Sequence, residues 1–440
     1  MAKFAVIYLV LFFVGIFSAL FTGGITAFYI YQLIYFIYPE NRWWFGDIPS
    51  IPYSYISVIV MILFLLKDYK NLSEKSPWLE QVVIKWLAAL LILYYMTILY
   101  ALAPEIHYDY TINLTKLLII FLVAYKLIYS EAALNGCIWA YIIGCTYIGY
   151  VATITGRNSG DRVEGIGMVD GVEANDTASA LVPAATLLML FAWQGNFKVR
   201  VYSLIMGALT ANGIILINSR GAFLGVVVSL GIFLLYMIFS KYQKKGQKLS
   251  AILLIVFGLT GAFIITDDGF WLRMSTLQDT EDGRSSGSNR ILFWMATFDM
   301  LDDHPLGLGI HGYNILAPVY MDEQTRGSVV NRSVHSLWFQ GLSEVGWLGL
   351  SVFLLMLITL FRISHKAKIY VLKKKEYNIY FKFIALECSL LGFLVAGTFI
   401  NRFRAEILYW MILFLLLAVK IYYLNPKKLH EETYDNIKKD

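Results

Sequence analysis

Long apolar stretches separated by short polar ones run along the whole chain. They lie at about residues 4–21, 25–38, 53–66, 82–102, 114–130, 132–154, 177–194, 201–218, 221–240, 249–266, 337–361, 379–400 and 405–424. Most approach the roughly 20 residues that an α-helix needs to cross a hydrocarbon core of about 30 Å. The second and third are short enough for one to be re-entrant. The pattern therefore predicts an all-α polytopic membrane protein with about 11–13 transmembrane helices.

The basic residues indicate which connections lie on which side of the membrane. Lysines crowd three connections, at residues 241–248, 362–375 and 427–428. The positive-inside rule places all three in the cytoplasm. The long polar segment 267–335 falls between the first two and is therefore expected on the opposite side. Up to residue 334 it contains five arginines, ten acidic residues and no lysine, which agrees with that placement.

Three further connections are expected on the same side as the long loop. By alternation of the spans, the polar segment 155–176 and the short joints at 218–221 and 401–404 face outward as well. Four loops thus converge on one surface. We see no internal repeat, so residues 1–440 are expected to form a single integral membrane domain.

Composition supports a membrane protein and gives no sign of a nucleic-acid partner. Hydrophobic residues make up 58% of the chain and charged residues only 15%, against about 25% in ordinary soluble domains. The net charge of +5 reflects lysines in short connections, where they act as topology signals. The three cysteines lie inside apolar stretches, with neither a disulfide framework nor a metal-type spacing.

The long loop is expected to contain a short amphipathic helix. Between Asn289 and Asp303, the apolar residues recur at helical spacing. Such a helix would lie at the membrane interface. Asp302-Asp303-His304-Pro305 ends the pattern, and glycines at 307, 309 and 312 predict a region of tight turns.

His335, at the end of this loop, is the strongest candidate for acid–base chemistry. A histidine has an ordinary pKa of about 6.5, so its neutral form can accept a proton near neutral pH. General base assistance of this kind contributes roughly 10²–10⁴ in rate. The alternative is a hydrogen-bonded histidine at a helix start. Ser336 follows it, but no Gly-x-Ser-x-Gly motif supports a hydrolase.

Two arginines are candidates for binding an anion beside His335. Arg220 lies between two apolar stretches with almost no loop to separate them, and Gly221 permits close backbone approach. Arg290 opens the amphipathic helix, four residues before Trp294. A guanidinium matches phosphate oxygens with a planar fork. The alternatives are an interfacial anchor for Arg220 and a plain surface residue for Arg290.

Weaker candidates surround these residues. For Arg157 and Arg162 in the second loop, and for Arg402 and Arg404 in the last joint, a structural role is the more economical interpretation. His304 and His311 share the long loop with two aspartates, but their spacing matches no standard metal motif, so we expect no metal site.

Three segments together resemble the O-antigen ligase and polymerase superfamily. They are Asn218-Ser219-Arg220-Gly221-Ala222-Phe223-Leu224-Gly225, then Arg290-x-x-x-Trp294 with Asp303-His304-Pro305-Leu306-Gly307-Leu308-Gly309, and finally His335-Ser336-Leu337-Trp338-Phe339-Gln340 with Glu344-Val345-Gly346-Trp347-Leu348-Gly349-Leu350. The likeness extends over about residues 150–360. The stretches 38–46 and 162–176 resemble the ligase-like branch associated with exosortase systems.

The resemblance implies a bacterial inner-membrane glycosyltransferase with the loop 267–335 in the periplasm. Such ligases move a glycan from undecaprenyl diphosphate to a sugar of the lipid A core, with inversion and without a metal or other cofactor. His335 would then be the base that activates the acceptor hydroxyl. Arg220 and Arg290 would bind the diphosphate, and Trp294 would join Arg157, Arg162, Arg402 and Arg404 as residues expected to contact substrate.

Other functions remain open on the sequence. A polymerase uses the same donor but transfers to another carrier-linked glycan, and an oligosaccharyltransferase transfers to protein serine or threonine. A transporter or flippase would show paired broken helices and charges deep within corresponding spans, a pattern missing here. A membrane scaffold needs no reactive loop, so intact function after His335→Ala would favour it.

Overall fold

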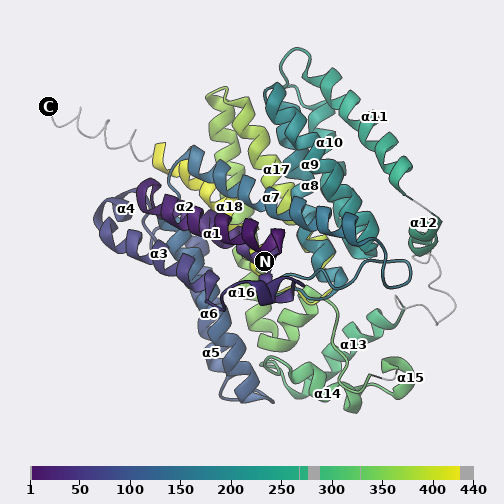
Figure 1. Cartoon of the computed structure of the whole chain (residues 1–440). Coiled ribbons are helices and arrows are strands. Elements are labelled where there is room, and N and C mark those ends of the chain that lie inside the picture. The colour runs from purple at the N-terminus through teal and green to yellow at the C-terminus, as the bar shows by residue number, and fades with distance from the viewer. Residues whose placement is uncertain (1, 267, 276–287, 328, 427–440) are drawn as a thin grey trace.

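The computed structural model describes residues 2–266, 268–275, 288–327 and 329–426, and these residues contain helices and no strand (Figure 1). The α-helices are α1 (Lys3–Thr22), α2 (Gly24–Ile37), α3 (Tyr53–Lys67), α4 (Tyr69–Lys75), α5 (Val82–Thr97), α6 (Pro104–Leu127), α7 (Glu131–Thr155), α8 (Ala174–Gln194), α9 (Phe197–Ile217), α10 (Arg220–Phe239), α11 (Gln247–Ile265), α12 (Asp268–Ser275), α13 (Ser288–Asp303), α14 (Gly312–Tyr320), α15 (Glu323–Arg326), α16 (Leu337–Lys373), α17 (Tyr377–Gly397) and α18 (Glu406–Val419). The short elements are η1 (Pro39–Asn41), η2 (Phe45–Asp47) and η3 (Lys420–Leu424).

Nine helices in the described part of the chain are long and apolar enough to cross a membrane. They are α1, α6 to α10, α16, α17, and α18 continued to Leu424, and three shorter apolar helices occur at Tyr53–Lys67, Val82–Thr97 and Gln247–Gly261. This confirms the all-α polytopic class expected from the pattern of apolar stretches.

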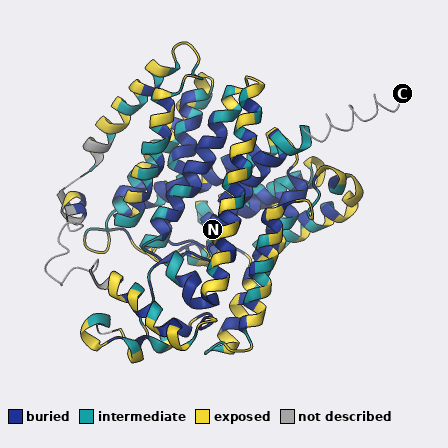
Figure 2. Cartoon of the chain, turned by 180° about the vertical axis from the view of Figure 1, so that it is seen from behind, coloured by how far each residue is buried: buried dark blue, intermediate teal, exposed yellow. Residues whose placement is uncertain are grey.

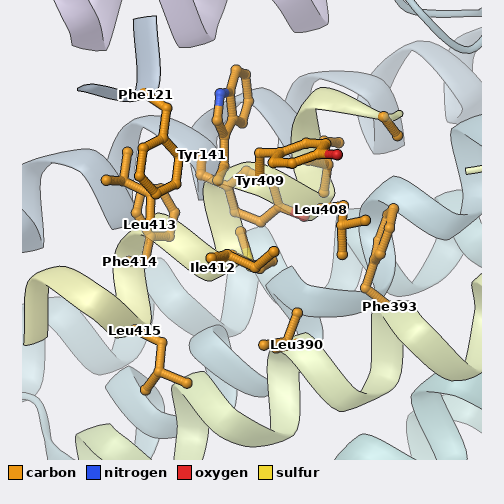
Figure 3. Close-up of a cluster of buried hydrophobic side chains, with 14 of the residues drawn as sticks. Phe121, Tyr141, Leu390, Phe393, Leu408, Tyr409, Ile412, Leu413, Phe414 and Leu415 are labelled. Atoms are coloured by element: carbon orange, nitrogen blue, oxygen red, sulfur yellow. The ribbon is translucent and has the colours of Figure 1, made fainter. Parts of the chain in front are cut away.

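The centre of the bundle is α18. Every residue from Ile407 to Val419 is buried, because α6, α7, α16 and α17 all pack against this helix. Figure 3 shows Tyr409, Ile412 and Phe414 of α18 among Tyr141 of α7 and side chains of α6 and α17. Aromatic and branched side chains at successive positions leave α18 no polar face, which is typical of a helix enclosed on all sides.

The outer surface of the bundle is apolar. Buried residues lie inside the bundle and exposed ones on its periphery (Figure 2). Phe21 of α1 is 75% exposed and Phe257 of α11 is 70% exposed, for example. Exposed apolar patches this large are unusual for proteins in water but match the environment of lipid chains.

Some helix boundaries differ from those expected. The helix α6 begins at Pro104 instead of about residue 114, because His107 of its first turn packs into the protein although the residues around it stay exposed. The helix α16 continues beyond residue 361 to Lys373, through a segment whose charged residues are exposed except Lys368, which pairs with Glu387. A helix is confirmed at the expected place, as α13.

Small helices gather at one end of the bundle. There α13, α14 and α15 lie beside the N-terminal end of α16 (Figure 1). The turn between α9 and α10 and the joint between α17 and α18, residues 398–405, reach the same region through the contacts described below. We call this region the loop end. It holds most of the residues that the sequence marks as candidates.

Candidate functional site

A break in α16 joins two of the sequence motifs. The helix loses its regular conformation at Val345 and Gly346, where φ of Gly346 is +63°. At the break, backbone carbonyl groups of the preceding turn lose the amide donors that a continuous helix would supply. The amide of Leu308 donates to the Ser343 carbonyl at 2.7 Å, and the amide of Gly309 donates to the Glu344 carbonyl at 3.0 Å. The segment 306–309 therefore replaces the helical hydrogen bonds that the break removes.

Glycine is required on both sides of this contact. Gly307 has φ of +100°, and a Cβ atom there would lie 2.6 Å from the Gly346 amide nitrogen. A Cβ atom on Gly346 would lie 2.6 Å from the Leu306 carbonyl carbon. Both close approaches involve backbone atoms, which cannot move aside as a side chain can. The glycines of the two motifs are thus explained by the packing of one segment on the other.

The helical segment before the break, Leu337–Glu344, is held by a buried carboxylate. We call this segment the stub. Glu344 accepts hydrogen bonds from Tyr94 Oη at 2.6 Å, from Gln340 Nε2 at 2.9 Å and from the Arg404 guanidinium at 3.1–3.3 Å. Gln340 Oε1 in turn accepts from the amide of Phe403 at 3.0 Å. The stub is thereby fixed to α5 and to the joint 398–405.

His335 lies two residues before the stub, in a strained backbone conformation. Its φ is +51°, in the left-handed region that histidine enters more readily than most residues. Its ring lies 6.3 Å from that of Phe293 in α13, and its Nε2 is 3.2 Å from Ser333 Oγ. The next amide, of Ser336, donates to Asn401 Oδ1 at 3.2 Å. Strained residues of this kind cluster at functional sites.

The surroundings of His335 disfavour its protonated form. Burial lowers the pKa of His335 to about 4, and the positive charges of Arg290 and Arg332 act in the same direction. The imidazole is therefore neutral at neutral pH and has a lone pair available. An anion between these guanidinium groups would offset their charges and raise the proton affinity of the ring again.

The helix α13 brings Arg290 and Trp294 to the stub. The Trp294 ring stacks on Phe339 with centroids 5.4 Å apart and an interplanar angle of 7°. On the preceding residue of α13, Phe293, the ring lies under the guanidinium of Arg332, whose central carbon is 5.2 Å from the ring centroid. Sequence reasoning missed Arg332, although it lies three residues before His335 in the same polar run.

Arg220 opens α10 at a sharp turn in the same region. Asn218, with φ of +55°, ends α9, and its side-chain amide donates to the backbone and carboxylate oxygens of Asp161 at 3.2 Å. A methyl group on Gly221 would come within 3.3 Å of Phe399 Cβ. The Phe399 ring lies 6.2 Å from Trp294. Packing through Phe399 therefore connects the start of α10 with the aromatic contact between α13 and the stub.

The second loop is attached to the end of α9. The amide of Val163 donates to the Leu216 carbonyl at 3.0 Å. Arg162 donates from Nη2 to Asn175 Oδ1 at 3.1 Å, and its Nε is 3.7 Å from Glu164 Oε1. Arg157 is half-buried in the same loop. These contacts bring Arg162 close to the turn that carries Arg220.

The two arginines of the last joint form ion pairs within the protein. Arg402, only 2% exposed, donates to the Asp170 carbonyl at 2.7 Å and to its carboxylate at 3.1 Å. Arg404 pairs with Glu344. Both also line a neighbouring cavity, described below. The structure thus gives each of them a structural partner and a place beside a possible ligand.

Other reactive side chains of the loop end take no part in such a cluster. Ser336 is fully buried and so is not presented as a nucleophile. His311 begins α14 with φ of +68°. In the described part of the chain, no group of three or more histidine, cysteine or acidic residues is arranged to hold a metal ion.

One comparison with known proteins bears on this region. Residues 205–354 match the family model described as O-Antigen ligase. The match covers most of α9, the arginine that opens α10, α13 to α15, the histidine before the stub and the break in α16. It confirms the resemblance to the ligase and polymerase superfamily that these motifs suggested. No curated protein matches the chain.

Proposed function

We propose that this chain, whose residues 205–354 match the family model described as O-Antigen ligase, is a ligase that transfers a glycan from undecaprenyl diphosphate to a sugar of the lipid A core. The family match and the apolar helices support a membrane enzyme of the ligase and polymerase family. One observation supports this proposal most directly: the half-buried, neutral imidazole of His335 lies within the electrostatic influence of Arg290 and Arg332.

The reaction requires one proton acceptor and stabilisation of one leaving group. A hydroxyl oxygen of the acceptor attacks the anomeric carbon of the donor glycan, and its proton passes to the imidazole of His335. The bond between that carbon and the phosphate oxygen breaks, and undecaprenyl diphosphate departs with the bonding electrons. Attack from the face opposite the leaving group inverts the anomeric carbon.

Fixed positive charge at the diphosphate is the larger contribution to the rate. A diphosphate leaves without being protonated, so neither a strong acid nor a covalent intermediate is needed. Arg220 and Arg290 would bind it, as in the family motif, and Arg332 adds a third guanidinium. Hydrogen bonds to charged groups contribute about 1.5–3 kcal/mol each. Preorganised charge of this kind is typically the dominant catalytic term.

Donor binding would also activate the base. In the empty site the pKa of His335 lies near 4, too low for an efficient base at neutral pH. A bound diphosphate offsets the charges of Arg290 and Arg332 and raises this pKa toward neutrality. The imidazole then gains proton affinity only when a donor is bound, and it stays neutral when no donor is bound.

We infer that the loop end faces the periplasm of a bacterium whose inner membrane holds the bundle. The lysine-rich connection between α10 and α11 and that between α16 and α17 lie at the cytoplasmic side by the positive-inside rule. The long loop between them then lies outside, where carrier-linked glycans become available to such ligases.

The test is a deletion in the native host, complemented with wild type or with His335→Asn. Asparagine also accepts left-handed backbone, so this variant removes the imidazole while keeping the local conformation. Carrier-linked glycan is measured by mass spectrometry and surface polysaccharide by gel. A ligase deletion accumulates full-length glycan on the carrier, leaves the core bare and is not rescued by His335→Asn.

The other outcomes identify the rival functions. A single repeat unit on the core with loss of long chains indicates a polymerase. Loss of glycan from protein alone indicates an oligosaccharyltransferase. Normal surface glycan in the deletion, or full rescue by His335→Asn, overturns the proposal and favours a transporter or scaffold.

A further inference from the structure

A cavity of about 920 Å³ lies beside the place where the stub is attached to the joint 398–405. Its walls come from α2, α3, α6, the second loop and that joint. Asn401 and Gln340 line it, and Asn401 Oδ1 also accepts the amide hydrogen of Ser336, the residue after His335. The cavity is thus separate from the contacts of Arg290 yet reaches the backbone beside the proposed base.

One part of the cavity is polar and suited to hydroxyl groups. Tyr31 Oη donates to Glu406 Oε2 at 2.8 Å, and Tyr35 Oη donates to the Asp170 carboxylate. The amide of Glu406 donates to Asp170 Oδ2 at 2.7 Å. Carboxylates that accept, and phenols that both donate and accept, are the groups that can exchange hydrogen bonds with sugar hydroxyls. Aromatic faces provide the flat apolar surface on which sugar rings stack.

This polar part does not fit a second diphosphate. Its arginines are already paired, Arg402 with Asp170 and Arg404 with Glu344. Glu173 and Asp176 add further acidic groups to the lining. A polyanion would meet carboxylates that outnumber the unneutralised cations, and like charges at short range repel. The lining therefore favours an uncharged, hydroxyl-rich group such as a glycan.

The other part of the cavity is an apolar groove between two helices. Val58 and Ile62 of α3 face Leu117 and Ile119 of α6, and Ile119 is 45% exposed. Apolar side chains of this kind on membrane helices present a surface for a hydrocarbon chain. A ligand that fills both parts must therefore be a glycan attached to a lipid.

Lys116 lies where the two parts meet. It is exposed near the middle of α6 and lines the cavity. Its ammonium nitrogen makes one hydrogen bond, to Asn113 Oδ1 at 3.2 Å, and forms no ion pair with any described carboxylate. A lysine within a span costs about 2.5–3.5 kcal/mol on insertion scales, so such residues are usually functional.

The depth of Lys116 matches the junction between a lipid and its headgroup. The Tyr110 ring lies 4.7 Å from the Arg404 guanidinium, which marks the level of the joint. Lys116 is six residues further along α6, or about 9 Å at the helical rise of 1.5 Å per residue. An ammonium at this depth is placed to bind an anionic group between hydrocarbon chain and sugar.

We propose that this cavity binds the acceptor, a glycolipid that carries an anionic group at its lipid–sugar junction. The inference rests on the proposed function, because it assigns the second substrate of that reaction. Lys116 and Asn113 bind the anionic group, the chain lies between α3 and α6, and the sugars fill the polar part. The terminal sugar extends past Asn401 to His335, so donor and acceptor approach the base from different sides.

The test measures two binding constants on purified full-length protein in nanodiscs. The probes are lipid A–core oligosaccharide extracted from the deletion host and undecaprenyl diphosphate. For Lys116→Gln we expect binding of lipid A–core to weaken at least about ten-fold, the loss expected for one hydrogen bond to a charged group. Binding of undecaprenyl diphosphate should stay unchanged. Lys116→Arg should retain most of the affinity for lipid A–core.

Lys85→Gln is the matched control, because Lys85 is an exposed lysine of α5 outside the cavity lining. Tyr55→Leu, on the α3 wall, is a second variant should Lys116→Gln not fold; it too should weaken lipid A–core binding selectively. Unchanged lipid A–core affinity in the folded cavity variants overturns the inference. So does a loss of undecaprenyl diphosphate binding instead.

The two proposals fail in distinguishable ways. If the wild type binds both probes and transfers glycan while the cavity variants bind lipid A–core normally, the proposed function stands and only the site assignment falls. If the wild type binds neither probe and transfers nothing, the proposed function falls and the acceptor site with it.

Discussion

Gly346→Ala should destabilise the protein by inserting a methyl group into the break in α16. Gly346 has φ of +63° and ψ of −169°, a backbone region that is essentially restricted to glycine, and an L-residue there costs about 1–3 kcal/mol. The new Cβ would lie 2.6 Å from the Leu306 carbonyl carbon, so the segment 306–309 must move away. That displacement removes the two hydrogen bonds to the Ser343 and Glu344 carbonyls, each contributing about 0.5–1.5 kcal/mol. The expected loss in the free energy of unfolding is therefore about 2–6 kcal/mol.

Thermal unfolding of detergent-purified protein measures this loss, and in vitro transfer measures its effect on the site. Because the same contact holds the stub that follows His335, transfer should fall even below the unfolding temperature. Gly231→Ala is the control, since a Cβ atom there meets nothing within 4 Å on α10. Wild-type stability and transfer in Gly346→Ala would refute the role assigned to the contact.

Three further outcomes are expected. In the pH profile of kcat/KM, which reports the free enzyme, the fall in activity on the acid side should lie near pH 4. In the profile of kcat it should lie at higher pH, because bound diphosphate offsets the charges of Arg290 and Arg332. A fall of kcat/KM near pH 6.5 would contradict this. Glu344→Ala should lower stability by at most about 3–5 kcal/mol, because it leaves the Arg404 guanidinium, whose side chain is 19% exposed, without its partner. An unchanged melting temperature would exclude this. A chelator should leave transfer unchanged; inhibition reversed by one divalent cation would restore a metal mechanism.

The low pKa of His335 also makes the stability of the folded protein depend on pH. The folded His335 resists protonation until about pH 4, while the unfolded chain takes up a proton near pH 6.5. The unfolded state therefore binds more protons between these values, and this histidine makes the protein less stable as the pH falls from 6.5 toward 4. His335→Asn should flatten that part of the stability profile.

Local patterns in the sequence were sufficient to predict most of the long helices, but not the short ones α4, α12, α14 and α15. Apolar runs depend on neighbouring residues alone, and so does the spacing that indicated α13. The same reasoning placed the start of α6 too late, because His107 makes its contacts with the amide of Ile310 and the carbonyl of Tyr94. A polar residue that is satisfied by a distant segment looks like a loop residue in the sequence.

Only those residues of the candidate site that belong to sequence motifs could be predicted from the sequence. The motifs supplied His335, Arg220 and Arg290, but the break in α16 could not be inferred from Gly346 alone. Its cause is a segment almost forty residues earlier in the chain. Likewise, nothing near Glu344 in the sequence indicates that Tyr94 donates to it. Such contacts depend on how the helices pack, which the pattern of apolar residues leaves open.

The segment 306–309 and the break in α16 contact each other, and the order in which they are synthesised matters. Synthesis proceeds from the N-terminus, so the segment 306–309 leaves the ribosome before α16 does. A bare carbonyl group in hydrocarbon costs several kcal/mol, and the bend in α16 needs donors for those of Ser343 and Glu344. The segment that supplies the donors is thus synthesised before the helix that needs them. A rearranged gene that delivered α16 first would insert a bent helix whose two carbonyl groups have no donor.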